Sequence, residues 1–164
     1  MSDAAALRKV LNEAGVVYVD AGVLALHLAG DTRYLPLTRV VLGGLRDREF
    51  TGFTSSISLY QLLVEPYRSG HEKVAEQVEI LVAALPGLEV VPVSGTISRQ
   101  AAQVMTQIGG SLTRAIQIAT ALSGDSEIYV TQRSALRRIA GLGVAQLDAY
   151  RGAAAATAEG ASGS

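Results

Sequence analysis

Short runs of β-branched and apolar residues alternate along this chain with longer segments of helical periodicity, and this alternation constrains the fold more than any other feature. The clearest run is Val16–Val19, whose residues favour a strand buried on both faces. Further strands are predicted at 49–54, 88–93, 127–131 and 144–147. Strands that alternate with helices at these spacings form a parallel sheet with helices on its faces. The sequence therefore predicts an α/β protein with a central, mainly parallel five-stranded sheet.

The helical segments lie between the predicted strands. The most regular of them is predicted at 72–85, and a short one is predicted at 134–139. Ser55 and Ser56 are candidate N-caps for a helix that is predicted to end near Glu65-Pro66, because a residue that precedes a proline is displaced from the helical region.

Length and composition bound the domain organisation. The chain has 164 residues, of which 49% are hydrophobic and 5% aromatic, enough for one domain with an aliphatic core. We predict this domain at 13–150, preceded by a short helix or a loose arm at 1–12. Residues 151–164 are mostly Ala, Gly and Ser, a composition that predicts a disordered tail.

Charge and residue types exclude several classes of function. Fourteen basic and fifteen acidic residues give a formal net charge of −1, so nucleic acid can bind only through a local basic patch. The chain has no cysteine, which excludes disulfides, thiolate catalysis and cysteine zinc sites. His27 and His71 match no metal-ligand spacing. No signal-peptide pattern or membrane span is recognisable, and we expect a cytoplasmic protein without membrane contact.

Asp20 is the strongest candidate for a functional residue. It directly follows the run Val16–Val19, and ligands of open α/β sheets bind just beyond the carboxyl ends of the strands. Its carboxylate could also cap the next helix by accepting hydrogen bonds from the first-turn N–H groups. The position alone leaves both roles open.

Three segments carry motifs of a known family. The first is Val17–Asp20, the second is 54–68, and the third is 111–122 with the strand end that follows at 127–133. The most specific piece is Ala119-Thr120-Ala121. Together these segments resemble the PIN domain family, most closely its small VapC-type toxins, which are metal-dependent ribonucleases. The resemblance spans nearly the whole chain and implies a PIN-like three-layer sandwich with a central, mainly parallel five-stranded sheet flanked by helices.

The acidic positions that the resemblance implies are mostly lost. They fall on Asp20, Gln61, Arg114 and Arg133, so one carboxylate of the expected cluster remains. Magnesium and manganese prefer oxygen ligands, and in two-metal cleavage the ions stabilise the attacking and leaving oxygens. One aspartate beside two arginines carries a net charge of +1, which repels a divalent cation. We therefore expect no cofactor, with Asp20 as the only metal ligand if any ion binds.

The altered cluster leads to three hypotheses. The first is a pseudoenzyme in which Asp20 forms a salt bridge with Arg114 or Arg133, and which binds RNA or a protein partner. The second is phosphate recognition by Arg114, Arg133 and Arg137, because guanidinium forks suit phosphate oxygens. The alternative is an active magnesium- or manganese-dependent VapC-type endoribonuclease toxin, with Glu65 as a displaced ligand.

The resemblance also implies partners. VapC-type proteins commonly form homodimers and are neutralised by an antitoxin peptide that covers the site. We therefore expect a homodimer and an antitoxin-like protein partner, in addition to RNA.

Overall fold

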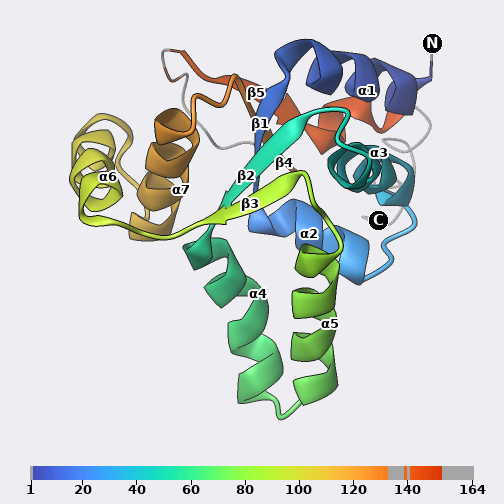
Figure 1. Cartoon of the computed structure of the whole chain (residues 1–164), viewed down its shortest axis with the longest axis horizontal. Helices are drawn as coiled ribbons and strands as arrows, with labels where there is room; N and C mark the ends of the chain where they lie inside the picture. Colours follow the sequence, from blue (N-terminus) through green and yellow to red (C-terminus); the bar gives the residue numbers. More distant parts are fainter. Residues whose placement is uncertain (1, 133–138, 140, 153–164) are drawn as a thin grey trace, which may run out of the picture.

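A parallel sheet forms the centre of the protein, which the computed structural model describes over residues 2–132, 139 and 141–152. Its five strands lie in the order β3-β2-β1-β4-β5 (Figure 1). Every neighbouring pair is parallel, which confirms the predicted sheet. The strands are β1 (Val16–Val19), β2 (Thr51–Ser55), β3 (Leu88–Val91), β4 (Ile128–Thr131) and β5 (Gly143–Gln146).

Helices cover both faces of the sheet. Helices α1, α2 and α3 lie on one face with the short 3₁₀ helix η1, and α6 and α7 lie on the other (Figure 1). Helices α4 and α5 form an antiparallel pair that extends away from the sheet. The bounds are α1 (Asp3–Ala14), α2 (Ala21–Leu28), α3 (Leu35–Arg46), α4 (Ser56–Arg68), α5 (Glu72–Ala83), α6 (Gly95–Ile108), α7 (Leu112–Ser123) and η1 (Leu147–Tyr150).

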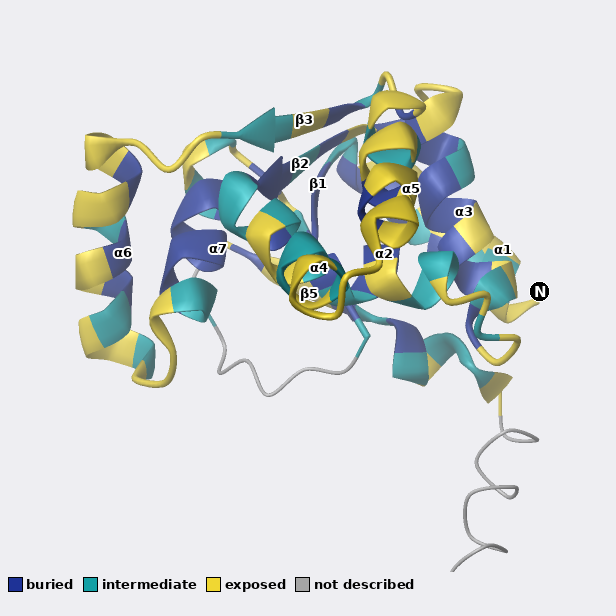
Figure 2. Ribbon diagram, turned by 90° about the horizontal axis from the view of Figure 1, so that it is seen from below, coloured by how far each residue is buried: buried dark blue, intermediate teal, exposed yellow. Residues whose placement is uncertain are grey.

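The central strand β1 contributes to both hydrophobic cores. Val17 and Val19 belong to the core beneath α1 and α3, whereas Tyr18 belongs to the core beneath α6 and α7. This explains the unbroken apolar run, because a strand covered on both faces has no side that meets water. Figure 2 shows the same arrangement in the helices, whose buried residues face the sheet while the exposed residues face outward.

The segment before β1 forms a helix rather than a loose arm. Leu7 and Leu11 of α1 are fully buried in the core shared with α3. The helix predicted at 134–139 and the tail predicted at 151–164 lie outside the described residues, apart from Ile139 and residues 151–152. Among the helices that the structure describes, none is long and apolar enough to cross a membrane.

Helix α4 runs past Pro66, so the prediction that it ends near Glu65 is wrong. The helix continues to Arg68 with the proline inside its last turns. The carbonyl of Glu65 accepts from the N–H of Ser69 at 2.9 Å, and that of Pro66 accepts from His71 at 2.8 Å. A proline near a helix end removes one backbone hydrogen bond, and in α4 the helix continues past it while packing against α5.

Candidate functional site

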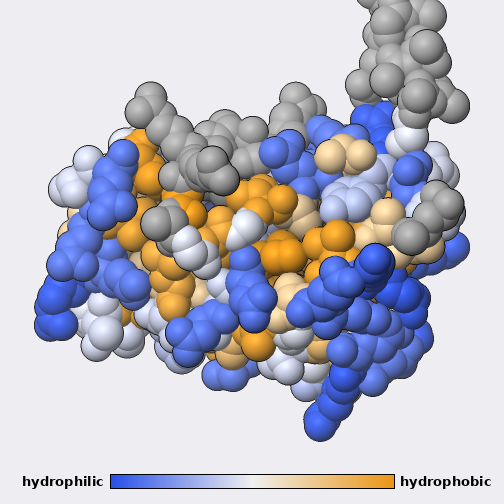
Figure 3. All heavy atoms as spheres, turned by 90° about the horizontal axis from the view of Figure 1, so that it is seen from above, coloured by the Kyte–Doolittle hydropathy of each residue, from blue (hydrophilic) through white to orange (hydrophobic). Residues whose placement is uncertain are grey.

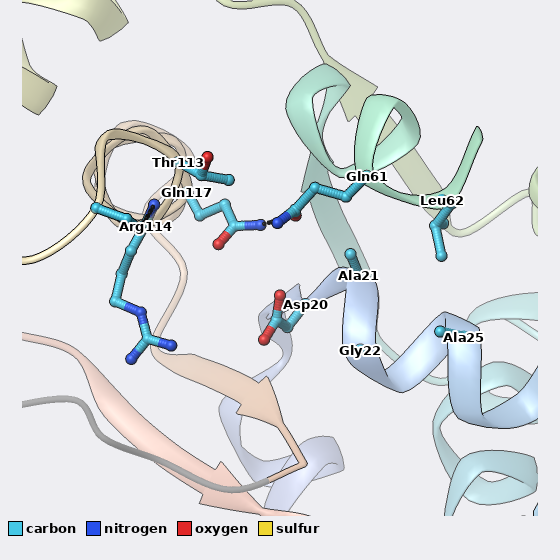
Figure 4. A pocket seen from close by; sticks show the side chains of 10 residues that line it. Asp20, Ala21, Gly22, Ala25, Gln61, Leu62, Thr113, Arg114 and Gln117 are labelled. Atoms are coloured by element: carbon cyan, nitrogen blue, oxygen red, sulfur yellow. Dashed lines mark hydrogen bonds between the residues drawn. The ribbon is translucent and has the colours of Figure 1, made fainter. Parts of the chain in front are cut away.

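A pocket of about 320 Å³ opens at the carboxyl edge of the sheet. It lies where the chain order reverses, because β2 and β3 follow β1 on one side of it while β4 and β5 lie on the other. Such a switch point is the usual ligand crevice of an open α/β sheet. The polar side chains that line it are Asp20, Gln61, Ser111, Thr113, Arg114 and Gln117 (Figure 4).

Asp20 faces this pocket and does not cap the helix that follows. It occupies the N-cap position of α2 but makes no side-chain capping bond. Instead, the hydroxyl of Thr131 at the end of β4 donates to its Oδ2 at 2.9 Å. Burial raises the pKa of the Asp20 carboxyl above its usual value, although the Thr131 hydrogen bond, the first-turn amides of α2 and the charge of Arg114 act against this. The carboxylate is therefore held by β4 and directed toward the ligand crevice.

The raised pKa of Asp20 predicts a pH-dependent stability. Because the folded state holds this proton more tightly than the unfolded chain, the favourable contribution exists at acidic pH and is lost as the pH rises through the folded pKa. The substitution Asp20→Asn keeps an acceptor for Thr131 and removes the buried charge. We expect it to raise the melting temperature by about 1–3 °C at neutral pH, with little gain near pH 4. Thermal unfolding of the wild type and of Asp20→Asn from pH 4 to neutral pH tests this prediction. An increase in melting temperature that does not depend on pH would contradict it.

Arg114 stands beside Asp20 without pairing to it. Its backbone N–H donates to the Oγ of Ser111 at 3.2 Å, which places the residue in the first turn of α7. Its charge lowers the pKa of Asp20, yet no ion pair joins the two within the part of the chain that the structure describes. The predicted salt bridge to Arg114 is therefore absent, and the carboxylate instead accepts from the Thr131 hydroxyl. Arg133 and Arg137 lie outside the described residues.

Gln61 and Gln117 meet across the pocket, one from α4 and the other from α7 (Figure 4). The Nε2 of Gln117 donates to the Oε1 of Gln61 at 2.8 Å. Gln117 is only 4% exposed, and its Oε1 accepts from the hydroxyl of Tyr129 at 3.3 Å. Gln117 was not predicted from the sequence, although a polar residue amid the apolar positions of α7 was a usable signal.

Two stacked tyrosines continue this polar network below the pocket. The rings of Tyr18 and Tyr129 lie 4.8 Å apart between centroids. The hydroxyl of Tyr18 lies 3.2 Å from the Oγ of Ser58, which in turn is 3.4 Å from the Nε2 of Gln117. Burial raises the pKa of Tyr18 to about 12 and also raises that of Tyr129, so both hydroxyls keep their protons at neutral pH. The network is therefore neutral and links β1, α4, α7 and β4.

Glu65 does not supply a second carboxylate to the pocket. Its two oxygens bind the guanidinium of Arg68 and the hydroxyl of Ser69, each at 3.0 Å, near the exposed end of α4. Asp20 is thus the one carboxylate among the described lining residues, and no described cluster of three His, Asp or Glu side chains exists. The sequence of 133–138 contains no acid and three arginines. This donor set does not fit a divalent cation, which requires several oxygen ligands.

Comparison with known proteins identifies the family. The family model of the PIN domain matches residues 17–142, a range that includes every polar residue lining the pocket. The chain belongs to the PIN-domain family. This confirms the resemblance found in the sequence. No curated protein matches this PIN protein in sequence.

Solved structures of similar fold include a toxin and toxin–antitoxin complexes. VapBC2 from Rickettsia felis, bound to a DNA fragment from its promoter, has a TM-score of 0.63 at 15% identity over 80% of this chain and 98% of that one. A toxin–antitoxin complex from Klebsiella pneumoniae has a TM-score of 0.58 at 16% identity, over 77% of this chain and 94% of that one. VapC20 from Mycobacterium tuberculosis, a Sarcin-Ricin loop cleaving toxin, has a TM-score of 0.54 at 16% identity, over 69% of this chain and 86% of that one. At these identities the likeness establishes the PIN fold and leaves the chemistry to the pocket itself.

Proposed function

We propose that this PIN-family protein binds RNA through a metal-free pocket and lacks the metal-dependent ribonuclease activity that the sequence resemblance implies. The observation that carries the proposal is the guanidinium of Arg114. It lines the pocket and forms no ion pair with the described residues, so it is available to an incoming anion. The phosphate groups of RNA are the anions that we infer.

The surroundings of Arg114 favour a phosphate. The first turns of α2 and α7 both line the pocket, and helix N-termini carry partial positive charge, although the α2 amides of Ala21 and Gly22 already act on the Asp20 carboxylate. The hydroxyls of Ser111 and Thr113 lie at the same entrance. Phosphate oxygens accept from guanidinium and hydroxyl groups such as these. Contacts of this kind to phosphate position a nucleic acid on its protein. Arg133 and Arg137 extend the basic character in the sequence that follows β4.

The lost carboxylates argue against nuclease activity. Cleavage assisted by two metal ions requires a cluster that holds both ions, and here Asp20 stands opposite a guanidinium. The alternative, an active magnesium- or manganese-dependent VapC-type toxin, needs carboxylate ligands from beyond the described pocket. We therefore propose a pseudoenzyme that retains the PIN fold as a binding module.

The binding proposal predicts a specific loss of RNA affinity. The substitution Arg114→Gln removes a charged donor, and we expect it to weaken binding of a single-stranded RNA about tenfold in buffer with EDTA. Fluorescence anisotropy of a labelled RNA measures this. Arg99→Gln, on exposed α6 and outside the pocket, is the matched control and should change affinity little. Equal losses in both variants would indicate diffuse electrostatic attraction and contradict a pocket site.

An antitoxin-like protein partner is supported by a separate hollow of about 520 Å³. Apolar side chains of α3, α5 and the turn after α5 line it together with basic side chains of α1 and α3. Its lining residues include Leu42, Leu81, Leu85, Arg8, Arg39 and Arg46. Arg8 and Arg46 bind Glu49 and Asp47, whereas Arg39 forms no ion pair within the described ranges. An amphipathic segment with acidic residues suits such a surface. Co-purification with the product of an adjoining gene, lost in Leu81→Asp, tests this partner.

The predicted homodimer is also a proposal. Figure 3 shows hydrophobic residues gathered across the middle of one face, between hydrophilic flanks. Such a band is suited to a second copy of the chain. Sedimentation of the isolated protein would measure its oligomeric state.

A further inference from the structure

We propose that Gln117 is a positioning residue: it turns the amide of Gln61 so that the Gln61 nitrogen donates into the pocket. Gln61 then becomes a second donor, beside Arg114, for a phosphate oxygen. The inference rests on the proposed function because phosphate is the ligand concerned. It follows from the direction of the hydrogen bonds beneath the pocket.

The direction begins at the backbone of β2. The N–H of Ser55 can only donate, and it donates to the hydroxyl oxygen of Tyr18 at 3.2 Å. The hydrogen of that hydroxyl is then available to the Oγ of Ser58, also at 3.2 Å. Because burial raises the pKa of Tyr18 to about 12, this hydrogen is present at neutral pH. The Ser58 oxygen can accept this hydrogen, and the Ser58 hydroxyl then keeps its own hydrogen for another partner.

The hydroxyl of Tyr129 fixes the orientation of the Gln117 amide. The group of Gln117 that faces Ser58 at 3.4 Å is Nε2, a donor. On the opposite side, the hydroxyl of Tyr129 donates to Oε1 at 3.3 Å. In the turned orientation Nε2 would face Tyr129, whose hydrogen would then lose its acceptor. Tyr129 thus favours the orientation of Gln117 in which Nε2 faces Ser58 and Gln61.

The orientation of Gln117 determines what Gln61 presents to a ligand. The Nε2 of Gln117 also donates to the Oε1 of Gln61, at 2.8 Å, which occupies the oxygen of that amide. The Gln61 nitrogen has no hydrogen-bond partner among the described residues, and the side chain lines the pocket (Figure 4). An amide that presents N–H groups binds phosphate, whereas one that presents its carbonyl repels it. Gln61 and Arg114 therefore offer donors from α4 and α7 to the same oxyanion.

A double-mutant cycle tests this coupling. The affinities for a labelled single-stranded RNA are measured in EDTA for wild type, Gln61→Leu, Gln117→Leu and the double variant, with inorganic phosphate as competitor. We expect Gln61→Leu to weaken binding about tenfold and Gln117→Leu at least about threefold, with the double variant no weaker than Gln61→Leu alone. Damage to the fold would instead weaken binding in both backgrounds. Gln77→Leu, on the exposed face of α5, should leave the affinity unchanged.

Tyr129→Phe keeps the test decisive if Gln117→Leu fails to fold. It retains the stacked ring and removes the hydroxyl that donates to Gln117. It should weaken RNA binding when Gln61 is present and have no effect in the Gln61→Leu background. If Tyr129→Phe weakened RNA binding equally with and without Gln61, while Arg114→Gln still weakened binding, the positioning role of Gln117 would be overturned. The proposed RNA-binding function would then remain. Wild-type protein that binds neither RNA nor phosphate would overturn the proposed function and this inference with it.

Discussion

Replacing Gln117 by leucine is expected to lower the free energy of unfolding by about 2–4 kcal/mol. Leucine fills a similar volume, so the loss arises from polar groups and not from a cavity. The buried hydroxyl of Tyr129 loses its acceptor, and the donor shared by Ser58 and Gln61 disappears. A buried polar group left without a partner retains the full cost of its removal from water.

The double variant with Tyr129→Phe separates this cause from a general packing defect. Removal of both partners is nearly neutral compared with removal of one, so we expect the second substitution to restore about 1–2 kcal/mol. Urea unfolding of the single and double variants measures the coupling. If the losses of unfolding free energy in the two single variants simply added in the double variant, the Gln117–Tyr129 hydrogen bond would contribute little to stability.

Restoring carboxylates to the pocket is expected to create manganese binding. In the double variant Gln61→Glu with Arg114→Asp, two new acids join Asp20 and a positive charge is removed. The Nε2 of Gln117 still finds an acceptor at position 61. The more negative pocket attracts a divalent cation, and we expect its affinity for Mn²⁺ to rise about 100-fold or more. Calorimetric titration with MnCl₂ measures the change.

Two controls show whether the gain belongs to the pocket. Arg114→Gln removes the positive charge without adding a ligand and should raise Mn²⁺ affinity only slightly. Arg99→Asp makes a similar charge change on exposed α6 and should have no effect. A gain of similar size in either control would mean that overall charge, and not the restored ligand set, governs metal binding.

The fold was accessible from the sequence because its central strands are covered on both faces. The run at Val16–Val19 has no polar position, which indicates a parallel sheet directly, and the helix with Ala119-Thr120-Ala121 indicated the family. The end of α4 was not accessible in this way. The rule for residues before a proline is local, whereas the helix also packs on α5 and has its terminal carbonyls bound beyond Pro66.

The site was only partly accessible. Asp20, Gln61 and Arg114 were predicted from their motifs, and the structure brings all three to one pocket. Their pairing was not predictable, because it depends on the Thr131 hydroxyl, which reaches Asp20 from a strand 111 residues away in sequence. Gln117 was missed because its role depends on tyrosine hydroxyls from β1 and β4 that meet it only in the folded protein.

Titration of the wild-type protein with manganese tests the central claim most directly. A pocket with one described carboxylate opposite a guanidinium should show no saturable Mn²⁺ binding at millimolar concentration, and RNA incubated with protein and Mn²⁺ should stay intact. The account would be contradicted by an ion bound at Asp20 together with RNA cleavage that Asp20→Ala abolishes.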